Sequence, residues 1–68
     1  MNTFSYANQV RLALKMKLSL YAWYSSSRVV PDSDSYSIVV SVSKLDNQVR
    51  KVIPQVVDGV SVKTEVEK

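Results

Sequence analysis

Cysteine and histidine are both absent from this chain, and glycine occurs only once. Without cysteine there can be no disulfide, thiolate metal site or thiol nucleophile, and without histidine the commonest metal ligand and general base is missing too. A single glycine cannot build the glycine-rich loop that cradles phosphates in nucleotide-binding proteins. These absences predict a protein that is not an enzyme, with no catalytic residue, no cofactor and no metal.

Long apolar runs are missing as well. The longest candidate, Leu18 to Tyr24, is interrupted by Ser19, whereas a membrane-spanning helix needs about 20 apolar residues. We therefore expect a cytoplasmic protein with no membrane association. Residues 1–68 are enough for one small domain, and a chain of this size buries only about 60% of its unfolded surface. With disulfides and metals unavailable, association with another chain is the remaining way to add stability.

The first element is predicted to be a helix over residues 5–24, with Thr3 or Ser5 as its cap, because no glycine or proline interrupts apolar residues at helical spacing. One apolar side is formed by Tyr6, Val10, Leu14, Tyr21 and Tyr24, flanked by Ala13, Leu18 and Leu20. A second apolar side contains Leu12, Met16 and Trp23. Residues 16–24 also alternate as a half-buried strand would, and this alternative stays open.

The remaining elements have clearer signals. Three serines, residues 25–27, should end the helix, followed by a short strand over residues 28–30, a turn over residues 31–34 and a strand over residues 36–43 that forms a hairpin with it. Asp46 can cap a helix over residues 47–53, which Pro54 ends. The Asp58-Gly59 dipeptide predicts a turn before a last strand over residues 60–66.

This order, helix-strand-strand-helix-strand, predicts an α+β fold of the two-layer α/β type. We expect a sheet of three or four strands that is covered on one face by the N-terminal helix. The connection between the strands at residues 36–43 and 60–66 is long enough for a right-handed parallel crossover. Alternatively, residues 54–57 form a strand, the Asp58-Gly59 turn makes a hairpin, and the sheet is antiparallel throughout.

The C-terminal half carries a recognisable succession of motifs. Ile38 to Val42 belongs to a predicted strand and reads Ile-Val-Val-Ser-Val, a polar connector follows, and Ile53 to Val62 reads Ile-Pro-Gln-Val-Val-Asp-Gly-Val-Ser-Val. Over residues 36–66 the chain resembles a small α/β module of uncharacterised bacterial proteins, sometimes found beside trypsin-like domains. The glycine-rich strand at the front of that module is replaced here by Arg28-Val29-Val30. The resemblance implies the topology above and carries over no catalytic residue and no function.

Charge and aromatic residues concentrate in the N-terminal half. Residues 1–31 carry a net charge of +4 and residues 32–68 a net charge of −1, and five of the six aromatic residues lie in the first half. Trp, Tyr, Met and Arg are enriched at protein interfaces, so Leu12, Met16 and Trp23 are candidates for a surface that forms a homodimer or binds a partner protein. An alternative is a nucleic-acid contact through Arg11, Lys15 and Arg28.

Overall fold

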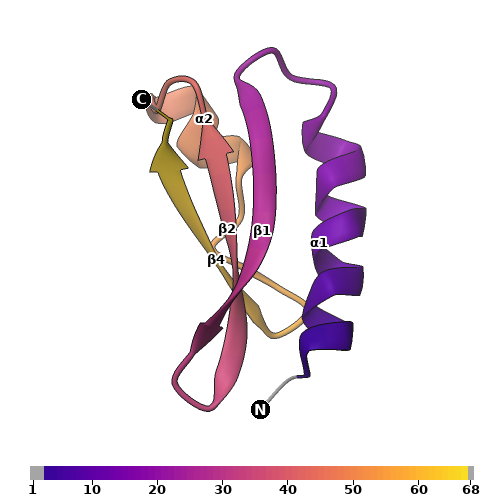
Figure 1. The fold of residues 1–68 in the computed structure, drawn as a ribbon. Helices are drawn as coiled ribbons and strands as arrows, with labels where there is room; N and C mark the ends of the chain where they lie inside the picture. The colour runs from indigo at the N-terminus through magenta and orange to yellow at the C-terminus, as the bar shows by residue number, and fades with distance from the viewer. Residues whose placement is uncertain (1–2, 68) are drawn as a thin grey trace.

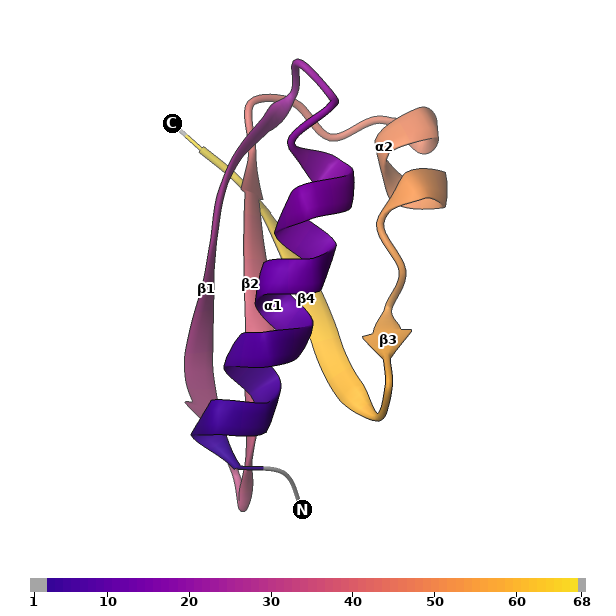
Figure 2. The same cartoon turned by 90° about the vertical axis from the view of Figure 1, so that its right-hand side faces the viewer.

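The computed structural model describes residues 3–67 and has an α+β fold (Figure 1). Its elements, in order, are α1 (Phe4–Leu18), β1 (Tyr24–Asp32), β2 (Ser35–Val42), α2 (Asn47–Val52), β3 (Val56–Val57) and β4 (Val60–Val66). The strands form one mixed sheet in the order β1-β2-β4-β3, and α1 covers one of its faces (Figures 1 and 2). The predicted fold class is therefore confirmed.

The sheet combines the two topologies that the sequence left as alternatives. β1 pairs with β2 antiparallel, and β2 pairs with β4 in parallel through the crossover that contains α2. β3 and β4 nevertheless form an antiparallel hairpin across Asp58-Gly59. A sheet that is antiparallel throughout is therefore wrong, although the hairpin on which that alternative depended is present.

Helix α1 is shorter than predicted. The Thr3 side chain caps its first turn by accepting a hydrogen bond from the Tyr6 amide at 3.1 Å, but the helix ends at Leu18 and not at Tyr24. Fifteen helical residues extend about 22 Å, which already matches the roughly 26 Å of the eight residues of β2. A helix that continued to Tyr24 would be about 30 Å long and would overshoot the sheet it covers.

The three serines that were expected to end the helix lie inside β1 instead. Ser26 and Ser27 stand opposite Ser41 and Val40 of β2, with an irregularity in the register after Tyr24. The C-terminal half of β2 needs β1 as a neighbour, because the backbone groups on that edge of β2 would otherwise be buried without hydrogen-bond partners. Pairing with β2 therefore outweighs the weak strand propensity of serine. β1 is accordingly nine residues long, not the three that were predicted.

The capping and turn predictions hold. The Asp46 carboxylate accepts a hydrogen bond from the Val49 amide at 3.0 Å at the start of α2, and Ile53 is extended ahead of Pro54. Asp58 and Gly59 both have positive φ, at 50° and 81°, as the central residues of a type I′ hairpin turn require. The predicted hairpin between β1 and β2 is also present, and it places Ser33 at a φ of 54°.

The core lies between the sheet and both helices. Its buried members are Ala7, Val10, Leu14 and Leu18 of α1; Ile38, Val40 and Val42 of β2; Val60 and Val62 of β4; and Val49 and Ile53 in and after α2. The predicted core face of α1 is right for Val10, Leu14 and Leu18. It is wrong for Tyr6, Ala13, Leu20 and Tyr21, which are exposed. The early end of the helix explains Leu20 and Tyr21, which lie beyond it.

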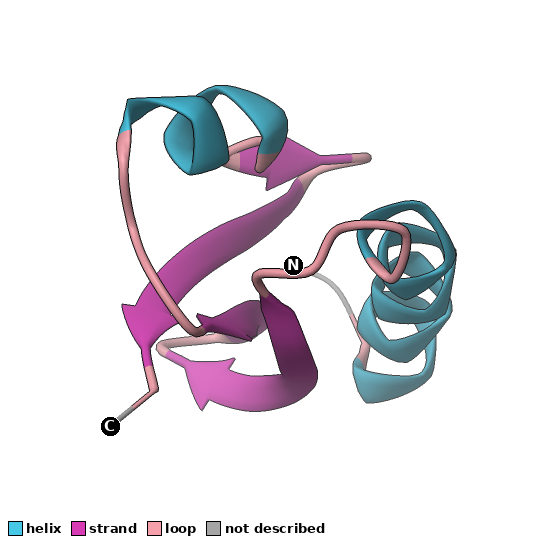
Figure 3. Ribbon diagram, turned by 90° about the horizontal axis from the view of Figure 1, so that it is seen from above, coloured by secondary structure: helices cyan, strands magenta, loops and turns pink. Residues whose placement is uncertain are grey.

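The two helices stand apart when the protein is viewed from above (Figure 3). α1 is anchored on β1 and β2, whereas α2 is attached separately through the buried side chain of Val49 and the following Ile53. Because the helices are fixed independently, the surface between them is a part of the fold where a concavity can form.

Candidate partner-binding surface

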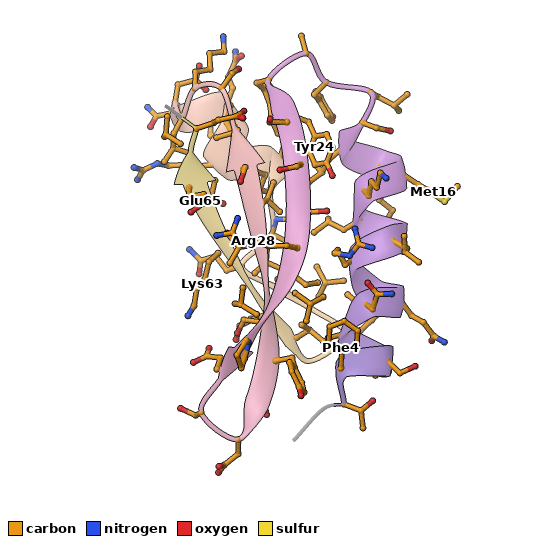
Figure 4. All side chains as sticks on the ribbon, in the orientation of Figure 1. Phe4, Met16, Tyr24, Arg28, Lys63 and Glu65 are labelled. Atoms are coloured by element: carbon orange, nitrogen blue, oxygen red, sulfur yellow. The ribbon has the colours of Figure 1, made fainter. Side chains whose placement is uncertain are left out.

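The sheet face turned away from the helices, here called the open sheet face, is lined by charged and hydroxyl side chains that pair with one another. Arg28 of β1 lies 2.6 Å from the Glu65 carboxylate of β4, which also accepts a hydrogen bond from Ser41 at 2.9 Å. Figure 4 shows Arg28, Lys63 and Glu65 together on this side of the molecule. The salt bridge joins the first strand of the sheet to a strand two positions away.

A second group on the same face has the same character. The Asp32 carboxylate accepts a hydrogen bond from the Ser37 hydroxyl at 2.7 Å and lies 3.3 Å from the Lys63 ammonium group. These two contacts hold the pKa of Asp32 below its ordinary value. In the group of Arg28, Ser41 and Glu65, the hydrogen bond from the Arg28 guanidinium lowers the pKa of Glu65, and the bond from Ser41 makes a smaller contribution.

Both carboxylates of the open sheet face are therefore stabilised in their charged form by partners within the protein. The hydrogen bond from Arg28 to Glu65 correspondingly raises the pKa of Arg28. A surface whose charges already neutralise one another offers little electrostatic attraction to a charged partner.

The helices present the opposite situation. The two helices, whose exposed surface is here called the helical layer, contain five basic residues and no acidic one: Arg11, Lys15 and Lys17 on α1, and Arg50 and Lys51 on α2. Within residues 3–67, none of the five forms an ion pair, and Arg11 donates only to the amide oxygen of Asn8, at 2.9 Å. Outside the helices, residues 19–46 and 53–67 carry three basic and six acidic residues. Positive charge is thus concentrated on one layer of the fold.

Apolar side chains are exposed on the same layer. Leu12 is 44% exposed and Met16 is 77% exposed, and Met16 projects away from the sheet on the far side of α1 (Figure 4). Val52 of α2 is 36% exposed, and Leu20 and Tyr21 add to this surface just beyond the end of α1. Both helices therefore carry exposed apolar side chains as well as basic ones.

The structure separates the residues that the sequence grouped. Leu12 and Met16 lie one turn apart on α1, as expected, but Trp23 is not on the helix. It lies in the connection to β1, partly buried against the core, and its ring stacks on Tyr21 with the ring centres 4.9 Å apart. The placement of Trp23 on a second apolar side of the helix is therefore wrong, because the helix ends five residues earlier.

The predicted nucleic-acid residues are divided in the same way. Arg11 and Lys15 lie one turn apart on α1, within the helical layer. Arg28 lies on β1 and faces the other side of the sheet, where Glu65 neutralises it. The three residues do not form one surface.

A groove lies between α1 on one side and α2 and β3 on the other, with a volume of about 400 Å³. Its apolar lining comes from Ala13, Leu14, Leu18, Val52, Pro54 and Val57. Its polar lining consists of Lys17, Tyr21, Lys51 and Asp58. The volume is within the range of about 300–1,000 Å³ typical of ligand pockets.

Sequence reasoning missed both the groove and the contribution of α2 to the helical layer. Arg50 and Lys51 belong to the half of the chain that is acidic overall, so the net charge of that half concealed them. The available signal was the composition of the two predicted helices taken together, because both lack acidic residues. Only the crossover between β2 and β4 brings α2 to the side of the sheet that α1 covers.

A second, more polar cavity of about 540 Å³ lies near the start of α1 and the two hairpin turns. Several of its polar groups are bonded within the protein: the Tyr6 hydroxyl donates to the Asp58 carbonyl at 2.8 Å, and the Asp32 carboxylate is held by Ser37 and Lys63. Across residues 3–67 there is no cluster of three or more side chains suited to bind a metal ion. No helix in that part of the chain is long and apolar enough to cross a membrane.

Comparison of the chain with models of protein families, with curated proteins and with solved structures gave no match. The functional argument therefore depends on the geometry and charge of the protein's own surfaces. Of these, the helical layer combines unpaired charge, exposed apolar side chains and a groove.

Proposed function

We propose that this protein is a non-enzymatic interaction module that binds an acidic protein partner through the helical layer. The observation that carries the proposal is the presence, within residues 3–67, of five basic residues without an ion pair and no acidic residue on α1 and α2, which also expose Leu12, Met16 and Val52. Complementary charge accelerates encounter and selects the partner, while apolar side chains at the centre of an interface supply most of the binding energy. Methionine suits such a surface because its flexible side chain adapts to its neighbours.

Self-association through α1, which the sequence suggested, is less well supported by this surface. A twofold-symmetric dimer places the same patch of each copy against the other. Two helical layers would then bring the ten basic side chains of four helices together, with only the Asp58 residues of the two grooves as acidic groups between them. The positive charge of the helical layer would make two copies repel each other, and the same charge would attract an acidic partner.

Nucleic acid is the second candidate, because the basic residues of both helices would also attract phosphates. Arg28 does not support it, since this side chain is paired with Glu65 on the open sheet face. The exposed aromatic rings on and next to α1 are also partly occupied, since Tyr21 stacks on Trp23 and Phe4 packs edge-on against Tyr36, which reduces the surface on which bases could stack. The cytoplasmic location and the absence of a cofactor remain predictions.

Binding to a fluorescently labelled peptide rich in glutamate and leucine tests the proposal, with a labelled single-stranded DNA of equal charge as the comparison. The variant with Lys15→Gln, Lys17→Gln and Lys51→Gln should bind the peptide roughly 3- to 150-fold more weakly, at about 0.2–1 kcal/mol for each exposed charge. Lys44→Gln is the matched control, because Lys44 lies outside both helices and pairs with Asp46. Tight binding of DNA without binding of the peptide would favour the second candidate.

A further inference from the structure

The groove between α1 and α2 is the most concave part of the helical layer. Its floor includes Leu14 and Leu18, which are core residues of α1, and its opposite wall is formed by Val52, Pro54 and Val57. Both walls are held in place from behind: α1 by its packing on β1 and β2, and α2 by the buried Val49. The groove is therefore preformed, which lowers the entropic cost of filling it.

The charges of the groove are asymmetric. Lys17 projects from α1 and Lys51 from α2, so that each wall contributes one ammonium group. Asp58, the one acidic residue of the lining, lies in the turn between β3 and β4, at the other end of the groove from α2 (Figure 2). An occupant with carboxylates next to an apolar group would be attracted at the end with the lysines and repelled at the end with Asp58.

We propose that this groove receives one bulky apolar side chain of an acidic partner segment, while Lys17 and Lys51 contact the carboxylates that flank it. The inference deepens the proposed function and rests on it. A second copy of this chain that docks through its own helical layer is a poor occupant, because that layer would bring more lysines to the two already there. An apolar anchor between acidic residues matches both the lining and the charge.

Trp23 provides a reporter for occupancy. It is the single tryptophan, and its ring stacks on Tyr21, which lines the groove. A side chain that enters the groove changes the surroundings of Tyr21 and hence the emission of Trp23. A peptide with one phenylalanine between glutamates can therefore be titrated without a label, because phenylalanine does not contribute to tryptophan emission.

The blocking variant is Ala13→Phe. Ala13 is an exposed residue of α1 that lines the groove, so a larger side chain can fill the groove without entering the core. Gln9→Phe is the control, because Gln9 is an exposed residue of α1 that does not line the groove. Ala13→Phe should weaken binding of the phenylalanine peptide at least about tenfold, whereas Gln9→Phe should change it less than about twofold.

A double-mutant cycle tests the role of the two lysines. Replacing the glutamates next to the phenylalanine by glutamine should be strongly non-additive with Lys17→Gln and with Lys51→Gln, and additive with Lys15→Gln, which is outside the groove. If Ala13→Phe binds the peptide normally while the variant with Lys15→Gln, Lys17→Gln and Lys51→Gln does not, the helical layer is the binding surface but the groove does not hold the phenylalanine. If the wild-type protein binds no acidic peptide at low salt, both proposals fall. Binding of a long-chain fatty acid in place of the peptide would also overturn the inference.

Discussion

Val49 attaches α2 to the rest of the protein, and its replacement by alanine should destabilise the fold by a predictable amount. The side chain is 1% exposed, and Val→Ala removes two carbon groups from the core. At about 0.8 kcal/mol for each buried group, with a further contribution from the cavity, the expected loss is about 2–3 kcal/mol. A domain of this length is expected to have a total stability of roughly 3–10 kcal/mol, so the variant should still fold in most of that range.

Val52→Ala is the matched control, since it makes the same chemical change in the same six-residue helix at a side chain that is 36% exposed. The gain in helix propensity from valine to alanine is common to both variants and cancels in the comparison. The loss for Val52→Ala should stay below about 1 kcal/mol. Urea unfolding followed by circular dichroism and by Trp23 emission measures both values. Equal losses in the two variants would refute the assignment of Val49 as the anchor of α2.

Three further predictions concern stability. Ser33→Gly should stabilise the protein by up to about 1 kcal/mol, because Ser33 has a φ of 54°, and an unchanged or lower melting temperature would argue against that turn. Thr3→Ala should cost about 1 kcal/mol in urea unfolding by removing the cap of α1, and no loss would contradict the cap. Asp32 and Glu65 have lowered pKa values in the folded state, so the stability they provide is present above their ordinary values of 3.8 and 4.5 and is lost as the pH falls below them. Glu65→Gln should therefore be less stable than wild type at pH 7 and nearly equal to it near pH 2; a constant difference across this range would contradict the salt bridge.

Local chemistry explains why much of the fold could be predicted. The Asp46 cap, the Pro54 stop and the Asp58-Gly59 turn each depend on residues that are adjacent in the chain, and the structure contains all three. The end of α1 could not be predicted in this way. Residues 16–24 satisfy both a helical and a strand pattern, and the choice between them depends on how long the sheet is and on the need of β2 for a neighbour.

The candidate surface was predictable only in part. Leu12 and Met16 were identified because helical spacing alone sets them apart from the core face of α1. Trp23 and Arg28 were misplaced because their positions depend on where α1 ends and on which face of β1 is covered. The basic residues of α2 become part of the same layer through the crossover connection, which is a long-range feature of the fold.

The surface that the protein uses can be mapped directly by titrating the acidic, phenylalanine-containing peptide into isotope-labelled protein and following the backbone amide signals by NMR. The account predicts that the largest changes will occur along α1 and α2, around Lys17, Lys51 and Val52, and that they will diminish as salt is added. The amides of Arg28, Lys63 and Glu65 on the open sheet face should move little. Changes centred on that face, or none on either helix, would contradict the claim that the helical layer is the binding surface.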